Sequence, residues 1–201
     1  MTVSVIYAHP SDDSFNYAIY ERVTKTLQEN RHTLYIHDLY EEGFDPILPS
    51  IEIPKNGKID NVIRQYCREL TDSDGIVIIH PNWWGMPPAI MKGWIDRVIR
   101  PGVAYGFKEN DQGEGVPVGM LKGKKAIVFN TGNTPLDREM NLFGDPLKNL
   151  WKTCIFDLCG ITDFTRRLYG VIVTSTLEQR KKWLTEVETI IKDKFPRANL
   201  S

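Results

Sequence analysis

The stretch that decides the fold reads Gly75-Ile76-Val77-Ile78-Ile79-His80-Pro81-Asn82-Trp83-Trp84-Gly85. Residues 76–79 are all β-branched and apolar, and no polar residue alternates with them. A short strand of this kind is buried on both faces, as strands are in parallel sheets covered by helices. The residues after it are rich in Pro, Asn and Gly, so they predict a loop at the carboxyl end of the strand.

Short apolar strands and amphipathic helices alternate on both sides of this stretch. We expect further strands at residues 3–8, 33–36, 126–129 and 168–173, and helices at residues 15–27, 59–70, 89–99, 147–158 and 183–191. This alternation predicts an α/β fold with a parallel sheet between two helical layers. Five strands favour the flavodoxin-like three-layer sandwich with strand order 2-1-3-4-5, formed as a single domain over residues 1–201. Residues 101–119 are Gly-rich and predict a long surface loop.

The composition excludes several classes of function. Lys and Arg number 25 and Asp and Glu 26, so the net charge of −1 gives no electrostatic footprint for nucleic acid. The longest apolar runs have the length of strands, and the N-terminus carries no signal-peptide pattern, so we expect no membrane insertion. Three cysteines without CxxC spacing fit reduced thiols in a cytoplasmic protein. The four histidines have no zinc-binding spacing, so we expect no metal site.

Ligands of such sheets bind beyond the carboxyl ends of the strands, near the point where the strand order reverses. The first loop there runs from His9 to the expected helix at Phe15 and Asn16, and Ser14 can cap that helix. A helix N-terminus offers free N–H groups to a phosphate. The loop has neither a GxGxxG nor a GxxxxGK[ST] motif. A capped helix after a turn explains it equally well, and His9 could simply bond to local backbone.

The second and third loops suit a flat polar ring system. Trp83 and Trp84 are adjacent in the loop after residue 81, and Trp supplies a large flat face with one N–H donor. The alternative is that one Trp packs in the core and the other in a subunit interface. The loop after residue 130 holds Thr131, Gly132 and Asn133, which an ordinary polar turn would also explain.

Together these segments resemble one family, the NAD(P)H:quinone oxidoreductases of the flavodoxin-like fold. That family includes the bacterial drug-modulator and potassium-efflux ancillary reductases. The segments that carry the resemblance are Ala8-His9-Pro10, Ser14-Phe15-Asn16, Pro81-Asn82-Trp83-Trp84-Gly85, Lys92-Gly93-Trp94, Gly102-Val103-Ala104-Tyr105 and Asn130-Thr131-Gly132. The resemblance is weakest in the C-terminal third.

The resemblance implies a flavin bound at a homodimer interface. It implies that the flavin takes a hydride from NADH or NADPH and passes two electrons to a quinone in a ping-pong cycle. By position, the phosphate-bearing chain would be held by His9, Ser14, Phe15 and Asn16. The ring or ribityl chain would be contacted by Pro81, Asn82, Trp83, Trp84 and Gly85, and the polar edge of the ring by Thr131, Gly132 and Asn133. Tyr105 would line the acceptor pocket as the catalytic hydrogen-bond donor.

Two departures from the family pattern matter. The mammalian-type quinone reductases carry a histidine where this chain has Phe143. Residues 46–58 form a shorter segment than in the FAD-binding members, where this segment helps to hold the adenine half of the cofactor. The short segment favours FMN, with FAD as the alternative. Asp96 and Arg97 are expected to be a structural pair rather than a catalytic one. Two other functions remain open, a flavodoxin-type electron carrier and a regulatory ancillary subunit of a cation transporter.

Overall fold

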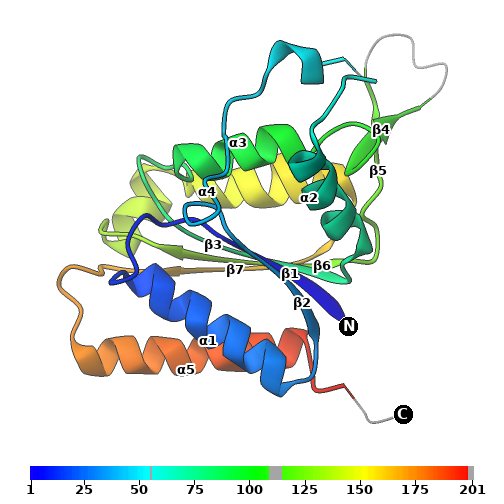
Figure 1. The fold of residues 1–201 in the computed structure, drawn as a ribbon. Coiled ribbons are helices and arrows are strands. Elements are labelled where there is room, and N and C mark those ends of the chain that lie inside the picture. The colour runs from blue at the N-terminus through cyan, green and yellow to red at the C-terminus, as the bar shows by residue number, and fades with distance from the viewer. Residues whose placement is uncertain (55, 109–114, 199–201) are drawn as a thin grey trace.

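The computed structural model describes residues 1–54, 56–108 and 115–198. Five parallel strands form the central sheet (Figure 1). In sheet order these are β2 (Thr33–Asp38), β1 (Thr2–Tyr7), β3 (Gly75–Pro81), β6 (Lys125–Thr131) and β7 (Asp163–Tyr169). The predicted flavodoxin-like architecture and its 2-1-3-4-5 order are therefore confirmed.

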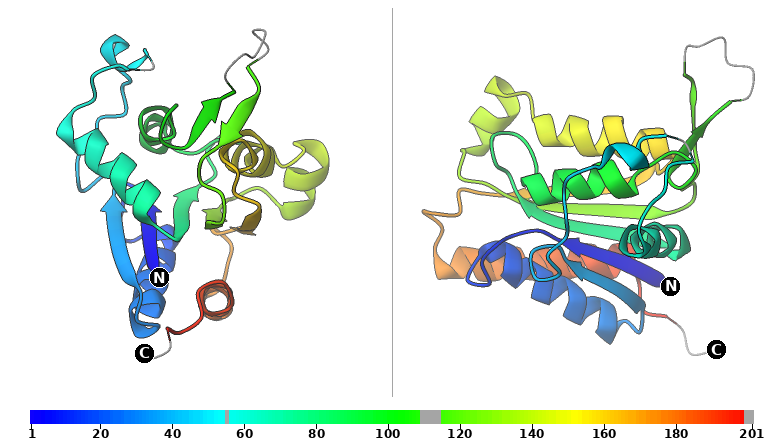
Figure 2. Two further views of the ribbon diagram at one scale, coloured as in Figure 1. Left: turned by 90° about the vertical axis from the view of Figure 1, so that its right-hand side faces the viewer. Right: turned by 45° about the horizontal axis from the view of Figure 1, so that its top comes forward.

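Helices cover both faces of this sheet (Figures 1 and 2). One face carries α1 (Phe15–Glu29) and α5 (Leu177–Lys194), which pack against each other. The other face carries α2 (Asn61–Asp72), α3 (Ala89–Val98) and the joined segments α4 (Pro146–Lys148) and η3 (Asn149–Asp157). No helix within the described ranges is long and apolar enough to cross a membrane.

The burial of β3 explains why its sequence does not alternate. Every residue of β3 is buried. Ile76 and Ile78 belong to the core beneath α2, α3 and η3, whereas Val77 and Ile79 belong to the core beneath α1 and α5. Successive side chains of a strand point to opposite faces, so a strand between two cores must be apolar at every position.

Three local predictions were wrong in detail. Within the expected surface loop, β4 (Tyr105–Phe107) and β5 (Pro117–Gly119) pair as an antiparallel hairpin, and residues 109–114 of that loop lie outside the described residues. The last strand begins at Asp163, earlier than expected. The prediction missed this start because β7 lies at the edge of the sheet, where a strand can be polar and only partly buried. The fourth helix is mostly π-helical over η3, a form that the apolar spacing does not distinguish from an α-helix.

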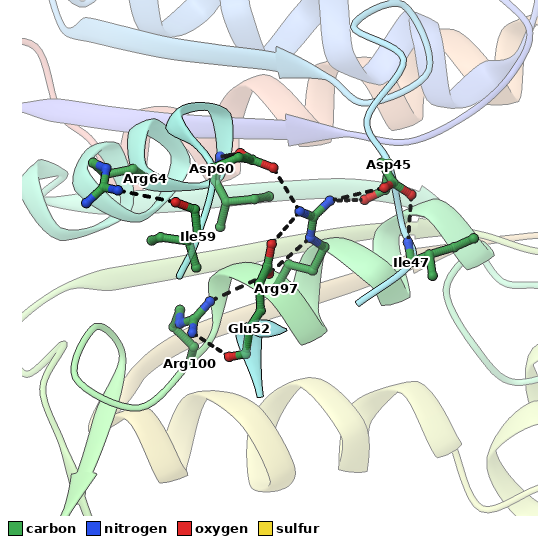
Figure 3. Close-up of polar contacts among 9 residues, drawn as sticks. Asp45, Ile47, Glu52, Ile59, Asp60, Arg64, Arg97 and Arg100 are labelled. Atoms are coloured by element: carbon green, nitrogen blue, oxygen red, sulfur yellow. Dashed lines mark hydrogen bonds and ion pairs between the residues drawn. The ribbon is translucent and has the colours of Figure 1, made fainter. Parts of the chain in front are cut away.

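Buried charges hold the segment after β2 against α3 (Figure 3). The Arg97 guanidinium is 4% exposed, and its Nη2 lies 2.6 Å from Glu52 Oε1 in η1 (Ser50–Glu52) and 3.0 Å from Asp60 Oδ2. Arg100 Nη2 donates to the backbone oxygen of Glu52 at 2.7 Å. Asp96 instead pairs with Lys92, so Arg97 has the expected structural role but with partners distant in sequence.

Gly93 allows this segment to approach α3. A Cβ atom at Gly93 would lie 2.3 Å from the Cα atom of Pro46, closer than real side chains come to backbone. Gly is otherwise unfavourable inside a helix. The close approach of Pro46 is therefore the physical reason for the glycine in the Lys92-Gly93-Trp94 motif.

We predict that Gly93→Ala destabilises the protein by about 1–3 kcal/mol, as overpacking does, even though Ala favours the helix by about 1 kcal/mol. Urea unfolding followed by circular dichroism measures this. Gly106→Ala is the matched control, because the nearest atom to its added Cβ is a flexible Met120 side chain at 3.8 Å. Equal stability of the two variants would contradict the packing of Pro46 on α3.

Candidate functional site

Backbone hydrogen bonds bring the three predicted loops to one edge of the sheet. Ala8 N donates to Ile79 O at 3.0 Å, and Asn82 N donates to Thr131 O at 2.7 Å. Gly132 N donates to Tyr169 O at 2.9 Å. These bonds continue the parallel ladder beyond the regular strands. The loops after β1, β3 and β6 therefore form one continuous rim at the carboxyl end of the sheet.

A cavity of about 490 Å³ opens between the second and third loops. This volume lies within the range of small-molecule sites. The predicted site residues that line it are Asn82, Trp84, Gly85, Gly132 and Asn133. The other lining residues come from the loop after β6 and from the two short helical segments that follow it: Thr134, Arg138, Glu139, Phe143 and Pro146.

The second loop closes in a tight turn that places Trp84 in an unfavourable position. Trp83 and Met86 exchange two backbone hydrogen bonds of 3.0 Å each. The φ angles of the central residues, Trp84 and Gly85, are +59° and +75°. Such a turn, with positive φ at both central positions, normally takes Asn, Asp or Gly at the first of them. Trp84 is nevertheless there, with its side chain 95% exposed beside the cavity.

The first loop caps the N-terminus of α1, and a side-chain hydrogen bond connects the start of this helix to the third loop. Ser14 Oγ accepts from Tyr17 N at 3.1 Å, so the hydroxyl acts as a helix cap. Asn16 is buried, and its Nδ2 donates to Thr131 Oγ1 at 2.7 Å. The Asn16 Oδ1 atom is buried without a hydrogen-bond partner among the described residues. Buried polar atoms are nearly always satisfied, so this oxygen suggests that a donor group binds nearby.

The remaining predicted residues of these loops differ in how far their side chains are buried. The ring centroid of His9 lies 6.1 Å from that of Trp83, and burial lowers the pKa of the His9 imidazole. The Phe15 ring packs against Tyr169 and so points into the core, which leaves only its backbone facing the loop. Pro81 is buried as the last residue of β3.

Tyr105 lies away from this rim. It is the first residue of β4, and the neighbouring Leu121 N donates to Cys159 O at 2.9 Å, just before β6 begins. The hairpin therefore lies at the amino end of the sheet, opposite the three loops (Figures 1 and 2). Within one chain, Tyr105 is not among the described residues that line the cavity.

A buried polar network supports the second loop from below. Trp151 Nε1 donates to His80 Nε2 at 2.9 Å, and the opposite ring nitrogen, Nδ1, donates to the Pro81 carbonyl at 2.7 Å. Asn130 joins His80 to Arg166, whose Nη1 lies 2.7 Å from Asp145 Oδ1. Burial lowers the pKa of His80 to about 4, so the ring is neutral near pH 7.

Several known proteins are similar to this chain. The family model of the flavodoxin-like fold matches residues 1–190. The chain belongs to this flavodoxin-like family. A Haemophilus influenzae protein named as an uncharacterized NAD(P)H oxidoreductase is 36% identical over 172 residues, which cover 84% of this chain and 83% of the relative. The quinone-type ribosyldihydronicotinamide dehydrogenase of Rattus norvegicus is 27% identical over 95% of this chain and 92% of its own length.

The crystal structure of Smu.1420 from Streptococcus mutans has a similar fold. It superimposes with a TM-score of 0.83 at 32% identity and covers 96% of this chain and 100% of its own. The resemblance to NAD(P)H:quinone oxidoreductases is confirmed by relatives that carry such names. The described part of this flavodoxin-like chain holds no group of three or more His, Cys, Asp or Glu residues that could bind a metal.

Sequence reasoning missed two charged residues of the cavity wall. Arg138 and Glu139 lie in the short π-helical segment η2 (Arg138–Leu142). Arg138 Cζ lies 5.3 Å from the ring centroid of Phe143, a cation–π contact. Glu139 is 2% exposed, and this burial becomes visible only once the chain is folded. The sequence between β6 and α4 has no apolar period that would show which side chains turn inward.

We predict that His80 makes stability depend on pH. The pKa is lowered from an ordinary 6.5 to about 4 in the folded protein. The unfolded chain therefore binds more protons between these values, and stability present above about pH 6.5 is lost as the pH falls toward about 4. Between about pH 7.5 and about pH 5, the wild type should lose about 2 kcal/mol more unfolding free energy than His80→Gln. Parallel losses in urea titrations would contradict a buried neutral His80.

Proposed function

We propose that this protein is an FMN-dependent NAD(P)H oxidoreductase that reduces a quinone or a similar electron-poor acceptor. The single observation that carries the proposal is the exposed Trp84 ring beside the cavity. A large apolar ring in water contributes nothing to folding, and this one also occupies a disfavoured turn position. Such features persist where they serve a ligand. A flat aromatic ligand on the Trp84 face is the simplest reason for both.

The residues of the rim fit a flavin. The cavity is large enough for a ring system, and the side-chain amides of Asn82 and Asn133 lie in its wall. A helix leaves its first N–H groups without helical partners, and those of α1 that precede the capped Tyr17 N–H suit a phosphate. Asn16 Oδ1 is buried without a hydrogen-bond partner among the described residues, and it would accept from a hydroxyl of the ribityl chain. When bound, the flavin supplies the two-electron chemistry, while the protein orients it and holds its surroundings.

We assign each predicted residue to a part of the cofactor. Ser14, Asn16, the His9 ring and the backbone of Phe15 would hold the phosphate-bearing chain. Pro81, Asn82, Trp83, Trp84 and Gly85 would hold the ring or ribityl chain, and Thr131, Gly132 and Asn133 the polar edge of the ring. The nicotinamide and then the acceptor would occupy the same open face in turn, which gives a ping-pong order.

Two observations favour FMN over FAD. The segment that would extend toward an adenine is fixed on α3 by Glu52 and Arg97. A second cavity of about 540 Å³ beside the first loop is lined by three acidic residues, Asp12, Asp38 and Glu41. Negative charges there disfavour the second phosphate and the adenylate of FAD. Neither feature prevents a single phosphate, as in FMN, from binding at the start of α1.

We also propose that the protein is a homodimer, because only a second copy could bring a Tyr105 to the rim of the first. The phenol would then donate a hydrogen bond to an acceptor oxygen as negative charge develops on it. A flavodoxin-type carrier is a weaker candidate, since those proteins are strongly acidic and this chain has a net charge of −1. If the protein were instead an ancillary subunit of a cation transporter, it would co-purify with that transporter. We expect the protein to be located in the cytoplasm.

We predict that Trp84→Asn weakens FMN binding about tenfold or more, on the order of 1.4 kcal/mol, because the ring loses its aromatic support. The fold should stay as stable or gain stability, since Asn suits the turn. Titration of the protein with FMN, followed by flavin fluorescence, measures the affinity. Trp84→Phe is the matched control and should keep most of it. The proposed function fails if the wild type binds neither FMN nor FAD.

We predict that Tyr105→Phe slows acceptor reduction by roughly tenfold, about 1.4 kcal/mol. One transition-state donor in a dry site contributes about 2.7–4 kcal/mol, and an open site with water reduces this. Flavin reduction by NAD(P)H should stay near the wild-type rate, and stopped-flow mixing separates the two half-reactions. Light scattering of the same sample should give a dimer. A monomer, or two unchanged half-reactions, would show that Tyr105 only packs in its hairpin.

A further inference from the structure

A buried carboxylate forms part of the cavity wall. Glu139 is 2% exposed, yet it lines the cavity together with Trp84 and Gly132. Its Oε1 accepts a hydrogen bond of 2.7 Å from Asn82 Nδ2. Across the ranges that the structure describes, no Lys or Arg forms an ion pair with Glu139, and the adjacent Arg138 guanidinium lies against the Phe143 ring instead. Among the described residues, the side-chain partner of this carboxylate is therefore a neutral amide.

The same carboxylate anchors the turn that presents Trp84. Asn82 Nδ2 is held by Glu139, and Asn82 Oδ1 accepts from Gly85 N at 3.0 Å. The amide orientation of Asn82 is fixed, because only its oxygen can accept from Gly85 N and only its nitrogen can donate to a carboxylate. Glu139 thus acts on the Trp84 turn through one intermediate side chain.

A carboxylate in this position opposes negative charge in the cavity. A hydride from NAD(P)H brings two electrons and one proton, so a reduced ring carries one added negative charge until a second proton arrives from solvent. Like charges repel more strongly where water is excluded than in bulk water. Charge near the ring is one of the means by which a protein tunes a bound cofactor.

We propose that Glu139 lowers the reduction potential of a flavin bound in this cavity, and that it positions the Trp84 turn through Asn82. The inference rests on the proposed function and deepens it. A lower potential makes the reduced cofactor a stronger donor, which extends the range of acceptors toward those that are harder to reduce. Glu139 is thus a tuning and positioning residue.

Two variants separate the charge from the anchor. Glu139→Gln keeps an oxygen for Asn82 Nδ2 but removes the charge. Glu139→Asp keeps the charge but is one methylene shorter, which withdraws it from Asn82. The matched control is Glu29→Gln, which removes an exposed carboxylate at the C-terminal end of α1, far from the loop rim (Figure 1).

The experiment is a spectroelectrochemical titration of each FMN-loaded protein, with the affinity for oxidised FMN measured in parallel. We expect Glu139→Gln to favour the reduced form about tenfold, a rise of about 30 mV for a two-electron couple, with unchanged affinity for oxidised FMN. Glu139→Asp should keep the wild-type potential and bind FMN more weakly. Glu29→Gln should match the wild type in both.

The outcomes distinguish this inference from the proposed function. Equal potentials for the wild type and Glu139→Gln would overturn the tuning role while leaving FMN binding and the proposed function intact. Full FMN affinity in Glu139→Asp would overturn the positioning role. A wild-type protein that takes up no flavin would overturn the proposed function itself, and the inference with it.

Discussion

The hydrogen-bond ladder between β3 and β6 is the interaction on which the rest of the structure depends. It runs in register from Gly75 and Lys125 to Pro81 and Thr131, and the bond from Asn82 N to Thr131 O extends it by one step. Parallel strands end at the same edge, so this register brings the second and third loops together. The cavity, its polar wall and the exposed Trp84 ring all follow from that extension. Buried side chains on both faces of β3 fix the register, because a slip would break two cores at once.

The loop rim combines a buried, hydrogen-bonded base with an exposed turn in a strained backbone conformation. Below it, the neutral His80 ring joins Trp151 and Asn130 to the Pro81 carbonyl, so the end of β3 is held by a buried polar network. Above it, Trp84 adopts a backbone conformation that large side chains seldom take. A rigid base can impose such a conformation on the residue that follows it. The separation of these two roles explains why the chain keeps His80 inside the protein and Trp84 in contact with water.

The sheet order and much of the rim could be predicted from the sequence. The apolar run of β3 reveals a strand buried on both faces, and parallel topology then places the loops after β1, β3 and β6 together. Tyr105 could not be placed, because no sequence pattern shows that its segment forms a hairpin at the amino end of the sheet. Glu139 could not be found either, since its burial depends on how η2 packs on Asn82. The partners of Arg97 are also invisible locally, because Glu52 and Asp60 approach it only after the chain folds over α3.

The central claim is that the cavity between the second and third loops holds the ring of a flavin. The most direct test is a crystal structure of the protein grown with FMN. We predict density for the ring against the Trp84 face, with its polar edge near Thr131, Gly132 and Asn133 and its phosphate at the start of α1. An empty cavity in FMN-saturated crystals, or FMN bound instead among Asp12, Asp38 and Glu41, would contradict the account.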